Sequence, residues 1–193
     1  RNYFIGGGNV GTNQGLNNTG IGHNVLASQV SGNGNIAIGA FTLDALTGGG
    51  SNTAIGTGSM GASVNVSGNT AIGSGTLQRV TGSNNTGIGS NALGNAILSG
   101  TQNSVIGYSS GLNLTTGSYN TFLGQDSGSS ITTGSYNVII GSNTGSTIAT
   151  SSNNIIISDG GGNIRQSFDI NGTATFSGSI VGTGGVMSLQ KNG

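Results

Sequence analysis

The chain has 193 residues, enough for one ordinary domain, but only 4% of them are charged, and Gly supplies 41. The formal net charge is zero and there is no Cys or Pro. With zero net charge, the chain has no net electrostatic attraction to nucleic acid or to an anionic lipid surface. No apolar run is long enough to span a bilayer. We therefore expect neither nucleic-acid binding nor membrane insertion, and no disulfides.

A five-residue pattern recurs ten times along the chain. Each copy has Asn first and Ile or Leu fourth, and Gly ends every copy except the last, which ends in Ser158. The copies occupy residues 2–6, 18–22, 35–39, 52–56, 69–73, 85–89, 103–107, 120–124, 137–141 and 154–158. Their final residues lie 16, 17, 17, 17, 16, 18, 17, 17 and 17 residues apart. A short, nearly constant period predicts stacked repeats.

The alternation inside each pentad predicts a short strand that ends at the Gly. We number that last residue 0, so that Asn is at −4 and Ile at −1. Further apolar residues recur at +4, and again at +7 or +8, before a Thr-Gly or Ser-Gly turn. The +7 or +8 set is Val30, Leu46, Val64, Val80, Ile97, Leu114, Ile131 and Ile148. We therefore predict an all-β fold, a parallel β-solenoid (β-roll) of about ten 17-residue coils over residues 1–158, with a weaker second strand in each coil.

Stacking places equivalent residues of successive coils above one another, about 4.8 Å apart, in a rod of roughly 48 Å. The Asn residues at −4 are expected to form an amide ladder, and the Ile residues at −1 to stack inside the roll. From Gly107 onward the +4 residue changes from Leu or Met to Gly. The rod is therefore expected to have two segments that differ in cross-section or packing.

The period fails after Ser158, and residues 159–193 are predicted to be a junction that leads to a further module. Residues 159–162 are expected to be a flexible break. Residues 164–168 and 173–181 are expected to be short strands around an Asn-Gly turn, followed by a second break at 182–185. Three charged residues gather at this junction and are expected to fix its register: Asp159, Arg165 and Asp169.

One roll is too thin to bury much apolar surface, so several chains are expected to associate. If Ile at −1 points inward, the uncharged −2 column points outward and needs cover. We therefore predict a parallel homotrimer whose axis is lined by the −2 column. The axis residues would include Ala37, Ala54, Ala71, Phe122, Ile139 and Ile156.

The Asn-Thr-Ala-Ile-Gly pentads at 52–56 and 69–73 resemble the head repeats of trimeric autotransporter adhesins, which are parallel β-rolls. The period of 17 and the Thr-Thr-Gly-Ser-Tyr-Asn motifs at 115–120 and 132–137 are more similar to repeats in bacteriophage tail fibres. Residues 151–160 also resemble a passage of those fibres. The resemblance implies a trimeric fibre, either in a virion or on a cell surface, with other fibre or virion proteins as partners.

Nothing in the sequence predicts an enzyme. His23 is the only His, and the four acids, all Asp, lie in separate coils or in the tail. Acid–base chemistry needs two such groups in one cleft, and a metal site needs clustered ligands. Residues 6–11 match GxGxxG, but neither the following helix nor the distant acid of a dinucleotide site is visible. We expect no catalytic residues, metal or cofactor.

The leading functional hypothesis is a structural fibre segment that extends and presents a receptor-binding tip. A second hypothesis is a glycan-binding module that uses exposed Tyr108, Tyr119 and Tyr136. A third is a surface filament that polymerises through open strand edges. Ice binding would need Thr-x-Thr on an exposed face, whereas here Thr at −3 is followed by Ile at −1.

Overall fold

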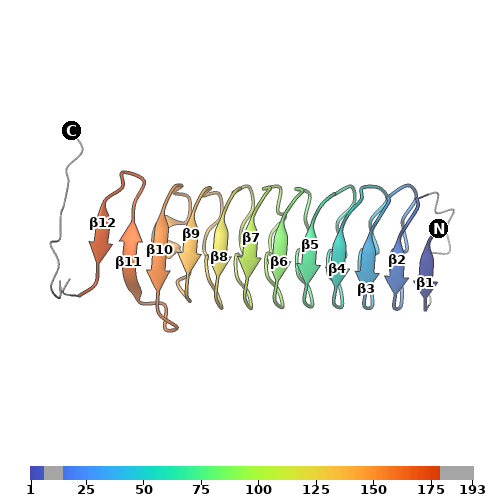
Figure 1. The fold of residues 1–193 in the computed structure, drawn as a ribbon, viewed down its shortest axis with the longest axis horizontal. Coiled ribbons are helices and arrows are strands. Elements are labelled where there is room, and N and C mark those ends of the chain that lie inside the picture. Colours follow the sequence, from blue (N-terminus) through green and yellow to red (C-terminus); the bar gives the residue numbers. More distant parts are fainter. Residues whose placement is uncertain (7–14, 179–193) are drawn as a thin grey trace, which may run out of the picture.

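The structure is a computed structural model that describes residues 1–6 and 15–178. Twelve strands form one sheet, in which each strand pairs with the next one along the chain. The ten strands β1 to β10 are parallel, and β11 and β12 are antiparallel to their neighbours. Figure 1 shows the resulting rod, with one strand per turn of a β-solenoid. The all-β parallel solenoid predicted from the 17-residue period is therefore confirmed.

The first nine strands follow the pentads closely, because each of them ends just before the Gly at position 0. The first nine are β1 (Tyr3–Ile5), β2 (Thr19–Ile21), β3 (Ile36–Ile38), β4 (Thr53–Ile55), β5 (Thr70–Ile72), β6 (Thr86–Ile88), β7 (Ser104–Ile106), β8 (Thr121–Leu123) and β9 (Val138–Ile140). The last three are β10 (Ile155–Ser158), β11 (Ile164–Phe168) and β12 (Ala174–Phe176). The described residues contain one short 3₁₀ helix, Ser146–Ile148.

The predicted second strand in each coil is wrong. Outside the named strands, the described residues form only two isolated bridges, Gly48 to Asn65 and Val80 to Leu98. Backbone hydrogen bonds still join successive coils there, as from Thr47 N–H to the Val64 carbonyl at 3.0 Å. Left-handed backbone at +2 and +4, as at Phe41 (φ 56°) and Leu43 (φ 50°), interrupts the extended chain that a strand needs.

The −2 column points into the solenoid, and this overturns the predicted trimer axis. Its members are fully or almost fully buried within a single chain: Ala37, Ala54, Ala71, Phe122, Ile139 and Ile156. They belong to the hydrophobic core and cannot line a contact between chains. Since side chains alternate across a strand, Ile at −1 and Thr at −3 instead point outward. In the coils of β2 to β6 the −2 residue is Gly or Ala, so the larger Ile at −1 is the one that points outward.

Two columns share the interior volume. Coils with Leu or Met at +4 have Ala or Gly at −2, whereas coils with Gly at +4 have Val, Phe or Ile at −2. Phe122 occupies the space that a side chain on Gly128 would need, since a Cβ there would lie 2.6 Å from the ring. The strand register continues unchanged through this exchange. The two predicted segments therefore differ in packing along one continuous sheet.

The apolar column predicted at +7 or +8 is only partly correct. Leu46, Val80, Leu114 and Ile131 are buried in the core. Val30, Val64 and Ile97 are 49, 47 and 60% exposed. At these coils a one-residue offset turns the side chain outward, and Gln29 and Ser63 are buried at +7 instead. Leu98, beside the exposed Ile97, is buried in the 18-residue coil.

The predicted amide ladder is present along the rod. The Oδ1 atom of Asn103 accepts from the backbone N–H and the side-chain amide of Asn120, both at 3.0 Å. The Asn103 amide also donates to the Gly117 carbonyl at 3.0 Å. The buried members are Asn18, Asn35, Asn52, Asn69, Asn85, Asn103, Asn120, Asn137 and Asn154. Each Asn from Asn18 to Asn137 therefore satisfies a backbone N–H and a backbone carbonyl of the next coil.

The segment after β10 is an ordered hairpin turn, where a flexible break was expected. The Asp159 N–H donates to the Asn163 carbonyl, and the Gly162 N–H donates to the Asp159 carbonyl, both at 3.0 Å. β11 then returns along β10, and β12 pairs with β11. β11 has the predicted bounds, whereas β12 is shorter than predicted. The expected end of that strand at 179–181 and the second break at 182–185 lie outside the described residues.

Candidate functional surfaces

The outward side chains of β1 to β10 form one surface, which we call the outer strand face. It combines the −3 column with the −1 column, so Thr and Ile lie on the same side of the sheet. Ile72, Ile106 and Ile140 in the −1 column are 37, 44 and 41% exposed. The −1 column reads Ile5, Ile21, Ile38, Ile55, Ile72, Ile88, Ile106, Leu123, Ile140 and Ile157. Neither column contains a charged residue. The −1 column is an apolar strip that lacks cover in one chain, and the −3 column beside it is mostly Thr or Ser.

The three tyrosines predicted to bind glycans do not form one platform. Tyr119 and Tyr136 occupy the −5 position of successive coils and stack with ring centroids 4.8 Å apart and an interplanar angle of 3°. Both residues have left-handed backbone, with φ of 60° and 58°. Tyr108 is exposed at position +1, in a different column of the coil. Since the stacked rings face each other, one face of each is already covered.

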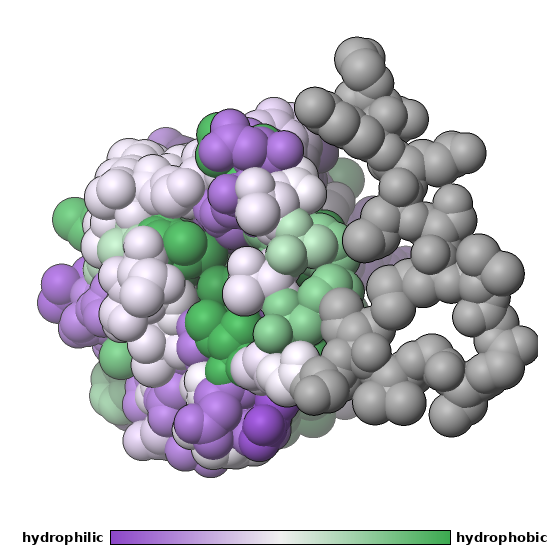
Figure 2. Space-filling view, turned by 90° about the vertical axis from the view of Figure 1, so that its left-hand side faces the viewer, coloured by the Kyte–Doolittle hydropathy of each residue, from purple (hydrophilic) through white to green (hydrophobic). Residues whose placement is uncertain are grey.

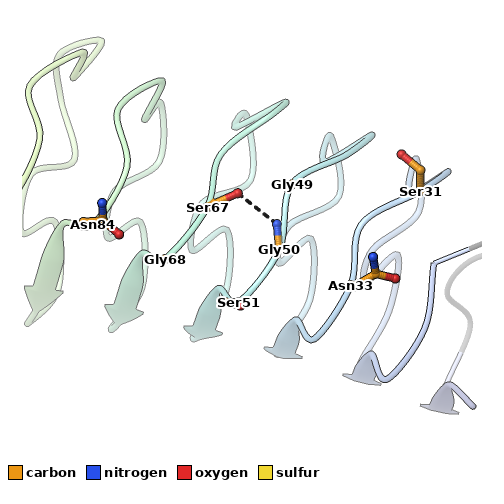
Figure 3. A pocket seen from close by; sticks show the side chains of 8 residues that line it. All are labelled: Ser31, Asn33, Gly49, Gly50, Ser51, Ser67, Gly68 and Asn84. Carbon is orange, nitrogen blue, oxygen red and sulfur yellow. Dashed lines mark hydrogen bonds between the residues drawn. The ribbon is translucent and has the colours of Figure 1, made fainter.

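A polar groove crosses the turns that precede β3 to β6. Figure 3 shows the groove and its lining side chains, which come from loops that enter successive strands. Its volume is about 490 Å³, and it is lined by Ser31, Asn33, Gly49, Gly50, Ser51, Ser67, Gly68 and Asn84. Neither a charged nor an aromatic residue lines it. This site was not predicted from the sequence, although the run of glycines at 48–50 is a visible signal of an open surface.

An apolar cleft of about 110 Å³ lies at the C-terminal end of the solenoid. Its apolar lining residues are Ile148, Ile156, Ile164 and Phe168, from the last coil and from β11. Figure 2 views this end and shows a hydrophobic strip between more polar surfaces. β11 therefore covers the edge of β10 without closing the whole end of the core.

The charged residues of the junction hold its turns. The Asp159 carboxylate accepts from the side chains of Asn163 and Arg165 and from the backbone N–H of Gly161. These hydrogen bonds, from Asn163 first and then Arg165, lower the pKa of Asp159 to about 2. Asp169 accepts from the Asn171 and Thr173 N–H groups, which lowers its pKa. These two carboxylates hold turns, whereas the sequence predicted that they fix the register of the junction.

The described residues do not bring His, Cys, Asp and Glu together as a metal site would need. No cluster of three His, Cys, Asp or Glu occurs in residues 1–6 and 15–178. His23 contacts Phe41 edge to face, with ring centroids 5.3 Å apart. Burial is the main cause that raises the pKa of Asp44. Within the same ranges, no helix has the length and apolar character needed to cross a membrane.

Comparison with protein-family models, with curated proteins and with solved structures found no match to this chain. The fold and these surfaces are therefore the basis for any functional assignment.

Proposed function

We propose that this chain is a segment of a trimeric fibre, in a bacteriophage tail or on a bacterial surface, that extends and presents an attachment tip. The observation that carries the proposal is the outer strand face. An apolar, uncharged strip along all ten parallel strands favours association with other copies of the chain. Parallel packing lets three such strips lie along a common axis over the length of the rod.

The energetic scale of this face is compatible with stable association. Covering a half-exposed Ile side chain contributes on the order of 1 kcal/mol, so the ten −1 residues together contribute on the order of 10 kcal/mol per chain. The cost of lost translational and rotational freedom on association is about 4–15 kcal/mol. Contacts through the −3 column add to the favourable free energy of association. The number three comes from the resemblance of the pentads to trimeric adhesin heads and tail fibres.

The mechanism of such a segment is mechanical. Strand pairing and the amide ladder run unbroken from coil to coil, so the rod keeps a fixed length and direction. Three chains that end together present three copies of a tip, which raises avidity for a surface. The proposed location is therefore outside the cell, in a virion tail fibre or a surface adhesin, with other fibre or virion proteins at its ends.

Solution mass tests the proposal. Light scattering on the 193-residue chain is expected to give three times the 18.7 kDa chain mass at micromolar concentration. Electron microscopy is expected to show short rods. A monodisperse monomer would contradict the proposal and would leave the Thr and Ile columns as an open face, for which ice binding is the next assay.

A further inference from the structure

The polar groove lies where position −5 carries only Gly or Ser over three coils. Position −5 has left-handed backbone throughout the described coils, with φ of 58° at both Ser51 and Tyr136. In the coils of β8 and β9 this position carries the stacked tyrosine rings. In the coils of β3 to β5 it carries Gly34, Ser51 and Gly68. The same backbone is therefore covered by aromatic rings in one part of the rod and left open in another.

The floor of the groove is backbone that a side chain would disturb. A Cβ on Gly50 would lie 2.5 Å from the Asn33 carbonyl oxygen, and a Cβ on Gly49 would lie 2.1 Å from the Val66 carbonyl oxygen. The Gly50 N–H donates to the Ser67 hydroxyl oxygen at 3.1 Å, a contact drawn in Figure 3. The floor is therefore held in place by bonds between coils before any ligand arrives.

Hydrogen-bonding groups along the groove remain available. The side chains of Ser31, Ser51 and Asn84 form no hydrogen bond within the described residues. The Oδ1 atom of Asn33 accepts from the Leu16 N–H at 2.7 Å, which leaves its amide N–H groups to donate. The Ser67 hydroxyl accepts from Gly50 and can still donate. Donors and acceptors thus recur along the rod at about the 4.8 Å spacing of the coils.

We propose that this groove binds a linear neutral polysaccharide that lies along the rod. A lining without charge gives no attraction to anionic or cationic groups, whereas repeated hydroxyl and amide groups suit a polyhydroxylated chain. The groove crosses the turns between successive coils and does not run along a free strand edge, so it offers no edge for a peptide strand. This site is separate from the outer strand face, and its occupation does not depend on the number of chains.

The site also differs from the predicted tyrosine platform, but the two lie in one line. Along position −5, Asn84 is followed by Gln102 and then by Tyr119, two coils or roughly 10 Å further on. A polysaccharide longer than the groove would extend toward Tyr119. The groove supplies most of the hydrogen bonds, so its residues decide the affinity.

Affinity electrophoresis of the full 193-residue chain tests the proposal. The gels would contain soluble β-1,4-glucan (hydroxyethylcellulose), galactomannan or amylose, with alginate as a charged comparison. We expect retardation by at least one neutral polymer. Ser51→Tyr fills the groove with a side chain that the same backbone carries at Tyr136, and it is expected to weaken binding at least tenfold. Asn84→Gly, which removes one amide and keeps the left-handed backbone, is expected to weaken it several-fold.

Asn153→Tyr is the matched control, because it places the same side chain at position −5 (φ 61°) outside the groove. It is expected to bind like the wild type, and all variants are expected to melt at similar temperatures. Three results would overturn the proposal: no retardation by any neutral polymer, retardation by alginate alone, or unchanged binding by Ser51→Tyr. Loss of binding in Tyr119→Ser but not in Ser51→Tyr would assign binding to the tyrosines and also overturn it. Light scattering on the same samples tests the fibre proposal separately.

Discussion

The buried Asn side chains are the most specific polar contacts of the rod at the scale of single residues. Each one is shut away from water and bonds to backbone groups, and the two groups bound by Asn103 have no other partner within the described residues. We expect Asn103→Ala to destabilise the rod by about 2–6 kcal/mol, because it leaves the Asn120 N–H and the Gly117 carbonyl buried without partners. Chemical denaturation followed by circular dichroism measures this change.

Asn95→Ala is the control for the ladder. Asn95 is exposed, and its side chain bonds only to Asn113 at the surface. Its removal is expected to change the free energy of unfolding by less than about 0.5 kcal/mol. If both substitutions changed the free energy of unfolding equally, the buried ladder would contribute no more stability than a surface hydrogen bond.

Positions −2 and +4 share the interior volume of each coil, and this leads to a second prediction about single residues. Ala54→Phe is expected to destabilise the rod by at least about 1–3 kcal/mol, because Met60 already fills the interior of that coil. Met60→Gly alone is expected to cost about 2–5 kcal/mol through the cavity it leaves. The double variant reproduces the arrangement of Phe122 and Gly128 in the coil of β8. It is therefore expected to lose less stability than the two single variants lose together.

A double-mutant cycle on thermal or denaturant unfolding measures the coupling between Ala54 and Met60. We expect the double variant to be more stable than the sum of the two single effects predicts, with a coupling energy of about 0.5–3 kcal/mol. Met60→Gly also removes a side chain from left-handed backbone (φ 51°), which reduces its cost in both contexts. Simple additivity would contradict the shared-volume account of the core.

The hairpin of β11 and β12 is the element whose stability depends on pH. Because the folded pKa of Asp159 is lowered to about 2, its stabilising effect is present above the unfolded value of about 3.9. That effect is lost as the pH falls through the folded pKa. We expect protection of the β11 amides against hydrogen exchange to fall between about pH 4 and pH 2, while protection of β5 stays unchanged.

Asp159→Asn separates this effect from other acid-induced changes. Asn keeps a hydrogen-bond acceptor at the turn but has no charge to lose, so the pH dependence assigned to Asp159 should disappear. Asp169, whose pKa is also lowered, acts in the same direction, whereas the raised pKa of Asp44 acts in the opposite one. A comparison of wild type and variant at each pH therefore isolates Asp159. Identical pH profiles would contradict the role assigned to its carboxylate.

At the scale of the whole molecule, the proposed fibre depends on association through the outer strand face. Lys at positions 72 and 106 would place two charges in the centre of the proposed interface and leave the core unchanged. We expect the Ile72→Lys, Ile106→Lys double variant to sediment as a folded monomer. Ile97→Lys is the control, because Ile97 is exposed but lies off this face. It is expected to remain a trimer in analytical ultracentrifugation.

End-to-end growth of the rod is opposed at its C-terminal side. The edge of β10 that would accept another parallel strand already pairs with β11 in the antiparallel direction. Polymerisation through that edge would require the hairpin to leave it. The hairpin thus acts as a cap for the parallel stack, which favours a segment of defined length over a self-polymerising filament.

The sequence by itself determined the period, the strand of each pentad, the amide ladder and the all-β solenoid. These follow from local pattern, because a fixed spacing of Asn, Ile and Gly places equivalent residues of successive coils above one another. The bounds of β11 and the Asn171-Gly172 turn after it could also be predicted, because strand-forming and turn-forming residues alternate there.

Tertiary structure alone decided which side of each strand is inside. Alternation fixes that Ile and Thr share a side, but it does not say which side faces the interior. The choice depends on the volume across the roll, where Leu and Met at +4 leave room only for Ala or Gly at −2. The complementary sizes of these columns were present in the sequence, yet their meaning required the two positions to be opposite each other in space. The polar groove likewise depends on the tertiary arrangement, because its lining residues become neighbours only when the coils are stacked.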